Sequence, residues 1–438
     1  MERVGVPRTP MGLWIMLILY LRIRPQTIVG RLPKIPHGER RMCAICCGGG
    51  GTFERRGPVL DAARGDAPQC ARTLEPLKSG MGVTMETNDP TADGVYLDDD
   101  GRILAERHRR WWAREGGLMA WVSHSSLGEL WLPLSDGTLA TQDLDLTPDM
   151  LDLERLAGDQ LEPGPLERNG DQFVTVTPYT RVPWVEAILG CPVRATIQGG
   201  SMRTRSFVAD WDAWHARDGR LHEGWFDALK QLTVMLAERG AGRYAVAQTL
   251  MRGPSDLAEA ILGPELMCLS MYDHPRALRG FLETVTEAFV TILNAQLKRI
   301  PRVQGGYVNP FGIWAPGTVV RTQCDASAFL SPAQYKEWFL PYDERISEAV
   351  GYATIHLHSG SLHTVPALLE VERPQAIQVT LDPEPSAPPT LSLIPTFRRI
   401  LEAKPVIIDG PLTAEEVHVL EQELPVDGRC ILARHEPW

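Results

Sequence analysis

Two kinds of apolar periodicity alternate along the chain from about residue 95 onward. Apolar side chains at steps of three and four residues predict amphipathic helices, of which residues 225–242 and 274–300 form the longest. Short β-branched runs predict buried strands, and three occur near the end of the chain: "YATIHLH" (352–358), "AIQVTL" (376–381) and "PVIIDG" (405–410). A helical segment, "TLSLIPTFRRILEAK" (390–404), separates the last two strands.

Helix-start signals add further elements. A threonine–proline pair begins "LTPDMLDLERLAGD" (146–159), and a serine–proline pair begins "SPAQYKEWFLPYDERISEAVG" (331–351), so each segment is predicted to be a single helix. The pattern also predicts strands over 173–179 and 243–250, and a helix over 253–263 that ends at a glycine.

Strands that alternate with helices over most of the chain predict an α/β fold with a parallel sheet covered on its faces. An open doubly wound sheet and a closed (β/α)8 barrel both fit this order of elements. No Gly-x-Gly-x-x-Gly sequence opens a helix, so the dinucleotide-binding fingerprint is missing. In either architecture, functional groups are expected where strands end, at the carboxyl edge of the sheet.

The first 95 residues differ from the rest of the chain. Basic side chains outnumber acidic ones over residues 1–80, and the segment contains the run "GGGG". Its apolar run at 11–21 is shorter than the roughly 20 residues of a membrane helix. Its Cys-x-x-Cys at 43–46 has no second pair at zinc-ribbon spacing. We expect residues 1–95 to form a disordered or non-domain N-terminal extension, and residues 96–438 to form the folded α/β domain.

The composition of the chain limits which classes of partner the protein is expected to bind. The chain is 44% hydrophobic and 23% charged, as is usual for a soluble globular protein. A formal net charge of −11 argues against nucleic acid as the main partner. Eight cysteines in 438 residues are too few for a disulfide scaffold and favour a reducing compartment. We therefore expect a cytoplasmic protein that acts on a small-molecule substrate and has no membrane or nucleic-acid partner.

Three histidines lie within the stretch "GYATIHLHSGSLHTV" (351–365). Because residues two apart on a strand point to the same face, His356 and His358 can converge on one point. Imidazole is a good zinc ligand, and a third donor from another strand end would complete a catalytic site. Alternatively, the two histidines only form hydrogen bonds with backbone or substrate. His363 is expected in the helix that follows and is a poor candidate ligand.

Two carboxylates and two other polar residues are further site candidates. Asp325 and Asp382 each follow a predicted strand, where they can relay protons, contact substrate, orient a ligand histidine or stabilise a loop. Arg252 precedes a Gly-Pro helix start and can pair with a substrate carboxylate or with a surface acid. Asn309 lies on a Gly/Pro-rich loop that is expected to form part of the pocket wall.

Three segments resemble the uroporphyrinogen decarboxylase-like superfamily. They are "RGPSDLAEAILGPELMCLSMYDHPRALRGFLETVTEAFV" (252–290), "CDASAFLSPAQYKEWFLPYDERI" (324–346) and "AIQVTLDPE" (376–384). They look like the family's Gly-Pro helix and long following helix, its Asp-containing loop with a Leu-Ser-Pro cap, and a later strand that ends in Asp. The resemblance extends loosely from residue 103 to the C-terminus and implies a (β/α)8 TIM barrel.

The superfamily has two branches with different chemistry. Uroporphyrinogen decarboxylase removes acetate carboxyl groups from a tetrapyrrole without a metal, whereas its cobalamin-dependent methyltransferase relatives bind zinc and move a methyl group between a corrinoid and a thiol. The methyltransferases carry His-x-Cys-Gly after a strand and a further Cys near the C-terminus. Here the matching stretch is His356-Leu357-His358-Ser359-Gly360, and His435 falls near the position of the last Cys, with Cys430 nearby.

This resemblance implies a methyltransferase-like enzyme with a modified zinc site made of His356, His358 and His435. A corrinoid would be its substrate or the cofactor of a partner corrinoid protein. The alternative is a metal-independent decarboxylase of a tetrapyrrole or a smaller carboxylate, although the decarboxylase's N-terminal Arg-rich signature has no match. A non-catalytic protein that binds a corrinoid or a corrinoid protein is the third hypothesis.

Overall fold

The computed structural model describes residues 99–123, 130–158, 170–217, 219–240 and 243–435. The predicted N-terminal extension (1–95) lies outside these ranges, as do the last three residues. In the part of the chain that is described, no helix combines the length and the apolar character that a membrane span requires.

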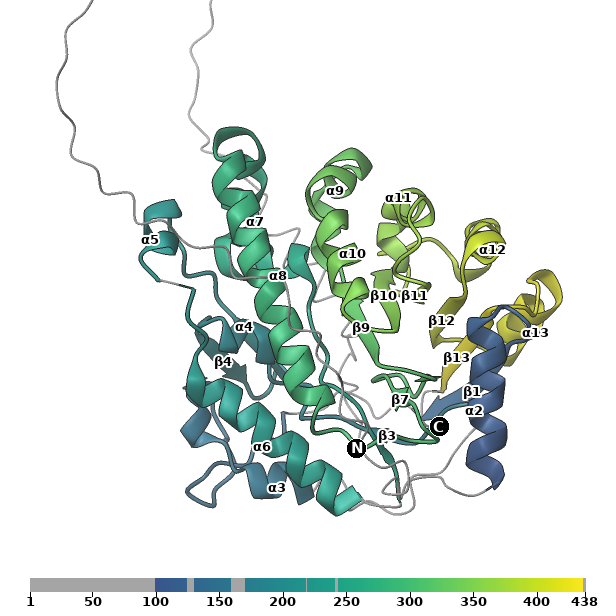
Figure 1. Ribbon diagram of the computed structural model, residues 1–438, viewed down its shortest axis with the longest axis horizontal. Helices are drawn as coiled ribbons and strands as arrows, with labels where there is room; N and C mark the ends of the chain where they lie inside the picture. Colours follow the sequence, from purple (N-terminus) through teal and green to yellow (C-terminus); the bar gives the residue numbers. More distant parts are fainter. Residues whose placement is uncertain (1–98, 124–129, 159–169, 218, 241–242, 436–438) are drawn as a thin grey trace, which may run out of the picture. The chain divides into compact units, whose positions relative to one another are not determined.

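A six-stranded parallel sheet forms the centre of the fold, with the strand order β1-β13-β12-β11-β10-β9 (Figure 1). The strands are β1 (Leu118–Ser123), β9 (Val319–Gln323), β10 (Tyr352–His358), β11 (Ala376–Thr380), β12 (Val406–Pro411) and β13 (Arg429–His435). All five pairings are parallel, and the first strand pairs with the last. The predicted α/β class with a parallel sheet is therefore confirmed.

Shorter strands form three further sheets. β3 (Thr175–Val176) and β6 (Ala245–Val246) are parallel, whereas β2 (Leu144–Leu146), β4 (Val193–Thr196) and β5 (Ser201–Thr204) form an antiparallel sheet, as do β7 (Tyr307–Val308) and β8 (Trp314–Ala315). Within the described ranges β3 and β6 pair only with each other, so no strand pairing joins them to the six-stranded sheet. The (β/α)8 barrel therefore stays a prediction.

Helices connect the parallel strands, and in Figure 1 α9 to α13 lie on one side of the strands they accompany. The α-helices are α2 (Asp99–Trp112), α3 (Leu153–Gly158), α4 (Trp184–Ile188), α5 (Trp211–His215), α6 (Glu223–Gly240), α7 (Pro254–Asp273), α8 (Pro275–Leu297), α9 (Pro332–Trp338), α10 (Leu340–Glu348), α11 (Val365–Leu369), α12 (Ile394–Ala403) and α13 (Ala414–Glu423). The 3-10 turns are η2 (Pro148–Met150), η4 (Asp325–Phe329), η5 (Ser359–Thr364) and η6 (Thr390–Leu393). Because η4 and η5 directly follow β9 and β10, both turns lie at the carboxyl edge of the sheet.

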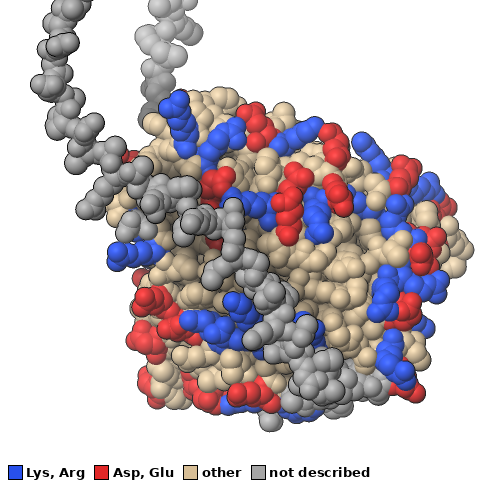
Figure 2. Space-filling model, viewed as in Figure 1, with Lys and Arg blue, Asp and Glu red and all other residues tan. Residues whose placement is uncertain are grey.

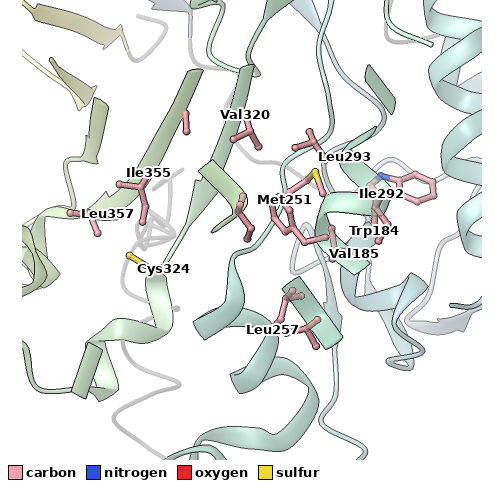
Figure 3. Close-up of a cluster of buried hydrophobic side chains, with 14 of the residues drawn as sticks. Trp184, Val185, Met251, Leu257, Ile292, Leu293, Val320, Cys324, Ile355 and Leu357 are labelled. Atoms are coloured by element: carbon pink, nitrogen blue, oxygen red, sulfur yellow. The ribbon is translucent and has the colours of Figure 1, made fainter. Parts of the chain in front are cut away.

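The two faces of the sheet bury different side chains. Val320, Ile355 and Leu357 belong to one large apolar cluster with residues of α7 and α8, and Figure 3 draws them together with Leu257, Ile292 and Leu293 of that cluster. Ile407 and Leu432 belong to a separate cluster on the opposite side of their strands. Strands buried on both faces read as continuous apolar runs, so a polar residue within such a run stands out.

Two segments predicted as single helices are each broken. Residues 146–159 form η2 and then α3, because Leu151 is extended (φ −79°, ψ 129°) and makes a β-bridge to Leu134. Residues 331–351 form α9 and α10, which meet at Phe339. Pro341 explains this second break, since a proline inside a helix lacks the N–H that would bond four residues back.

Other predicted boundaries also differ from the structure. The strands predicted at 173–179 and 243–250 are reduced to two residues each, in β3 and β6. The helix predicted to end at Gly263 instead continues to Asp273, with a kink where Gly263 has φ 79°. Glycine adopts that left-handed conformation without steric cost, so it bends this helix rather than ending it.

Charged side chains pair across the outer surfaces of the helices. Arg345 on α10 contacts Glu287 on α8 at 3.1 Å, and Arg279 on α8 contacts Glu337 on α9 at 3.5 Å. On the face shown in Figure 2, acidic and basic side chains are interspersed rather than segregated. Exposed pairs of this kind contribute about 0–1 kcal/mol each, so the apolar clusters dominate the stability of the fold.

Candidate metal centre

The two histidines of the His-x-His motif lie side by side at the end of β10. His356 is paired in register with Gln323 on β9 and Gln378 on β11, and His358 is paired with Thr380. Their ring centroids are 4.8 Å apart and their planes are inclined by 82°. The two imidazoles therefore share one face of the sheet and approach the same point.

A carboxylate from the neighbouring strand completes the cluster. Asp325 is the first residue of η4, immediately beyond β9. Its Oδ1 lies 3.4 Å from His356 Nε2, and its Oδ2 lies 3.7 Å from His358 Nε2. One candidate ligand atom from each of the three residues lies within 4.8 Å of the other two.

This donor set fits a divalent metal ion. Two imidazole nitrogens and one carboxylate oxygen, with a fourth position open, form a ligand set found in catalytic zinc sites. Asp325 Oδ1 is buried and has no hydrogen-bond partner among the described residues. A buried carboxylate oxygen without a partner is costly, and a cation at this point would satisfy it.

Hydrogen bonds behind His356 determine which of its nitrogens faces the cluster. Its Nδ1 lies 2.5 Å from Gln378 Oε1, while Gln378 Nε2 donates to Thr380 Oγ1 at 2.9 Å and to Asp409 Oδ2 at 3.2 Å. A carboxylate can only accept, so the amide nitrogen of Gln378 must face Asp409 and its oxygen must face His356. His356 therefore donates from Nδ1 and turns the Nε2 lone pair toward Asp325.

Asp409 is itself held in place by an arginine. Arg434 on β13 donates from Nε to Asp409 Oδ1 at 2.8 Å and from Nη2 to Asp409 Oδ2. The contacts thus run from Arg434 through Asp409 and Gln378 to His356. Such outer contacts orient metal-binding histidines and increase their affinity for the ion.

His358 has a carboxylate partner of its own. Its Nδ1 lies 2.7 Å from Asp382 Oδ1, and Asp382 accepts longer hydrogen bonds, at 3.4 Å, from Ser359 Oγ and Gly360 N. This is the geometry in which a carboxylate orients a ligand histidine, one of the roles considered for Asp382. A catalytic role for Asp382 stays a prediction.

The charges of the cluster balance internally. Burial, and then the charge of Arg321, lower the pKa of His356 well below its ordinary value. Burial opposes protonation of His358, but contacts with Asp325 and Asp382 outweigh it and raise its pKa to about 10. Burial likewise opposes ionisation of Asp325, but the two histidines outweigh it and hold its pKa below the usual range. Without a bound cation, the proton on His358 balances Asp325, so metal binding must release that proton.

A second buried carboxylate lies beside Asp325. Gln323 Nε2 donates to Asp325 Oδ2 and to Asp256 Oδ2, each at 2.9 Å. Asp256 Oδ1 accepts from Ala326 N at 2.8 Å. Burial, and then the charge of Asp325, raise the pKa of Asp256 well above its ordinary value. Gln323 therefore connects two carboxylates with opposite pKa shifts.

A glycine lets α7 approach the strand that carries Gln323. Gly253 N donates to Gln323 O at 3.0 Å, and a Cβ on Gly253 would lie 2.3 Å from that oxygen and 2.8 Å from Thr322 Oγ1. We expect Gly253→Ala to lower the free energy of unfolding by about 1–3 kcal/mol, because the added methyl group forces backbone apart. Urea denaturation measures the loss.

Gly280→Ala on α8 is the matched control, because a Cβ there meets nothing within 4 Å. Alanine is favoured over glycine within a helix, so this variant should be as stable as the unaltered protein or more stable. Equal denaturation midpoints for the two variants would show that the contact at Gly253 is not tight.

The remaining predicted site residues lie in other surroundings. Arg252 Nη1 is 3.1 Å from Glu186 Oε1, so an acidic partner already faces this guanidinium. Asn309 is fully buried, and its Oδ1 accepts from Phe311 N at 2.9 Å and Ile313 N at 3.2 Å. Substrate binding by Arg252 and Asn309 stays a prediction.

Two other histidines complete the comparison with the predicted site. His435 is the last residue of β13 and pairs in register with Ser123, but its side chain is outside the described part of the chain. Its role as third ligand stays a prediction, and Asp325 is the third member of the cluster that the structure describes. His363 lies in η5 and its Nε2 contacts Ser327 O and Leu330 O, away from the cluster atoms.

Sequence reasoning missed the residues that support the cluster, namely Asp256, Gln323, Gln378, Asp409 and Arg434. A usable signal existed for two of them. Gln378 and Asp409 are polar residues within the apolar runs "AIQVTL" and "PVIIDG". A polar residue inside a doubly covered strand must find a partner, so each marks the inward face.

Comparison with known proteins gives one distant structural similarity. No family model matches the chain, and no curated protein matches its sequence. Among solved structures, a methyltransferase from Methanosarcina mazei is similar with a TM-score of 0.44 and 12% identity, over 61% of this chain and 75% of that chain. So low a similarity establishes neither a family nor an activity for this protein.

Proposed function

We propose that the protein is a metal-dependent enzyme in which Asp325, His356 and His358 hold one zinc ion. The observation that carries this proposal is the cluster itself, in which three ligand atoms lie within 4.8 Å of one another. The hydrogen bonds of His356 Nδ1 and His358 Nδ1 support it, since they leave both Nε2 atoms free to act as metal ligands.

We further propose that the reaction is transfer of a methyl group from a corrinoid to a thiol. The resemblance of His356-Leu357-His358-Ser359-Gly360 to the His-x-Cys-Gly sequence of cobalamin-dependent methyltransferases supports this reaction. A bound zinc ion would lower the pKa of the thiol, so that the acceptor is held as a nucleophilic thiolate. His356 and His358 would bind the zinc ion, while Gln378 and Asp382 orient the two imidazole rings. The corrinoid would arrive free or on a partner corrinoid protein.

The proposal includes a closed (β/α)8 barrel. Strands β9 to β13 and β1 supply six parallel strands, and β3 with β6 supply two more. The pairing of the first strand with the last supports closure, because an open doubly wound sheet does not bring those two strands together.

Zinc analysis tests the metal site. We expect the purified full-length protein to contain about one equivalent of zinc and the His356→Ala/His358→Ala double variant to contain almost none, since two of three donors are lost. His363→Ala is the control, because His363 contacts the carbonyls of η4 instead. Mass spectrometry of the metal content after dialysis gives the readout.

Equal zinc content in the double variant and the unaltered protein would show that these histidines do not hold the ion.

A chelator distinguishes the rival reaction, decarboxylation, from methyl transfer. Loss of carboxyl groups from uroporphyrinogen that persists in the presence of a chelator would support a metal-independent decarboxylase in place of the methyltransferase.

A further inference from the structure

A buried arginine lies one inward-facing position below the metal cluster. Arg321 is on β9, two residues before Gln323, and is only 3% exposed. Two residues of a strand span about 7 Å, so Arg321 lies deeper in the sheet than the carboxyl edge. Its Nη1 donates to Gln323 Oε1, whose amide nitrogen contacts Asp325. One amide group therefore separates this guanidinium from the cluster.

The charge of Arg321 has no direct counter-ion. Among the described residues, no carboxylate oxygen lies within 4.0 Å of its nitrogens, and its buried Nε has no hydrogen-bond partner. The guanidinium carbon lies 5.3 Å from the centre of the Phe311 ring. Burial lowers the pKa of Arg321 to about 10, so the side chain still carries a charge at neutral pH. An unpaired buried charge is strongly unfavourable.

The nearest acids are already engaged by other groups. Asp325 faces the two histidines, Asp409 accepts from Arg434, and Asp256 accepts from Ala326 N and from Gln323. None of these carboxylates can turn to Arg321 without giving up those contacts.

A second unpaired donor lies opposite Arg321 on the next strand. Thr354 on β10 is its register partner and is fully buried. Thr354 Oγ1 also lacks a hydrogen-bond partner within the described ranges. Two unsatisfied donors on paired positions of adjacent strands, both on the face that carries His356, indicate a shared acceptor rather than two separate packing defects.

We propose that Arg321 and Thr354 bind a carboxylate group of the substrate beneath the metal cluster. A guanidinium can donate two parallel hydrogen bonds to a carboxylate, and the threonine hydroxyl can donate a third. The ligand is a short carboxylic acid whose other end, a few bonds from the carboxylate, binds the metal. This second contact rests on the proposed function. The site selects anionic ligands over neutral ligands of the same length.

Calorimetric titration of the full-length protein tests this site. Propionate supplies the carboxylate alone, 3-mercaptopropionate adds a thiol, and 2-mercaptoethanol supplies a thiol without the carboxylate. We expect propionate to bind saturably, and 3-mercaptopropionate to bind more tightly than either simpler compound when zinc is present. Arg321→Met should weaken propionate binding by about tenfold or more, the usual effect of losing charge-assisted hydrogen bonds.

Stability measurements separate ligand binding from a structural role. Arg321→Met removes an unpaired buried charge, so its thermal unfolding midpoint should be unchanged or higher than that of the unaltered protein. Thr354→Val should also weaken propionate binding, whereas Arg345→Met on the exposed surface of α10 should leave it unchanged.

Three results would overturn the carboxylate site: no saturable binding of propionate, equal binding by the unaltered protein and Arg321→Met, or a lower unfolding midpoint of Arg321→Met with binding intact. Propionate binding that persists in a protein unable to hold zinc would support Arg321 and Thr354 as a site while removing the proposed metal function. Zinc binding without propionate binding would support the metal site and rule out the carboxylate site.

Discussion

Asp409→Ala is expected to lower both the affinity for zinc and the free energy of unfolding. Asp409 is 1% exposed and holds Arg434 on one side and Gln378 on the other. Removing one partner of a fully buried ion pair typically costs about 3–5 kcal/mol. Because the Arg434 side chain is 28% exposed, water can solvate the remaining charge, so we expect a smaller loss of about 1–3 kcal/mol. Loss of an outer contact behind a ligand histidine lowers metal affinity by about 10- to 100-fold. Denaturant unfolding and competition with a zinc chelator measure the two effects.

The mechanism behind the second effect is the freedom of Gln378 to rotate. Without Asp409, the amide of Gln378 can flip and present its nitrogen to His356, which would favour the tautomer with the proton on Nε2. Asp427→Ala, on the exposed loop before β13, is the matched control and should change neither quantity. If Asp409→Ala destabilised the fold but bound zinc with unchanged affinity, the contact chain from Arg434 to His356 would have no role in the site.

Asp343→Asn is expected to stabilise the protein above neutral pH and to have little effect near pH 4. Asp343 on α10 is fully buried, and its Oδ2 accepts from Tyr335 OH at 2.8 Å. Burial raises the pKa of Asp343 from 3.8 to about 7, despite the opposing hydrogen bond from Tyr335. Between these two values the native state keeps a proton that the unfolded state has lost, so stability falls as pH rises through this window.

Asparagine removes this pH dependence because it stays neutral. The difference in unfolding free energy between Asp343→Asn and the unaltered protein should grow to about 4 kcal/mol by pH 8, at about 1.4 kcal/mol per pKa unit. Urea denaturation at a series of pH values measures it, with Glu348→Gln on the exposed side of α10 as the control. A difference that stays constant from pH 4 to pH 8 would mean that Asp343 is not held protonated by its surroundings.

The strand predictions near the C-terminus were accurate because those strands are defined locally. "YATIHLH", "AIQVTL" and "PVIIDG" correspond closely to β10, β11 and β12. Each is a short apolar run between clear breaks, and its central residues are buried on both faces. The predictions for 173–179 and 243–250 gave strands that were too long, because β3 and β6 pair only with each other over two residues.

The predicted helix boundaries were wrong where tertiary contacts or a proline overrode local helix propensity. The cap signal of Ser331 was correct, since its Oγ accepts from Gln334 N at 3.2 Å and Gln334 Oε1 accepts in return from Ser331 N at 2.8 Å. The continuation of that helix was wrong at Phe339, just before Pro341. A cap is a contact between neighbours in sequence, whereas the length of a helix depends on everything packed around it.

The sequence by itself determined that His356 and His358 share one face, because the two-residue period of an extended chain follows from backbone geometry alone. Only the tertiary structure decided what else meets them there. Asp325 follows β9, whereas Gln378 and Asp382 belong to β11 and the residues just after it, and the register of β9, β10 and β11 sets which side chains lie opposite each histidine. Register depends on how whole strands pack, so a shift of one residue would have turned these partners to the opposite face.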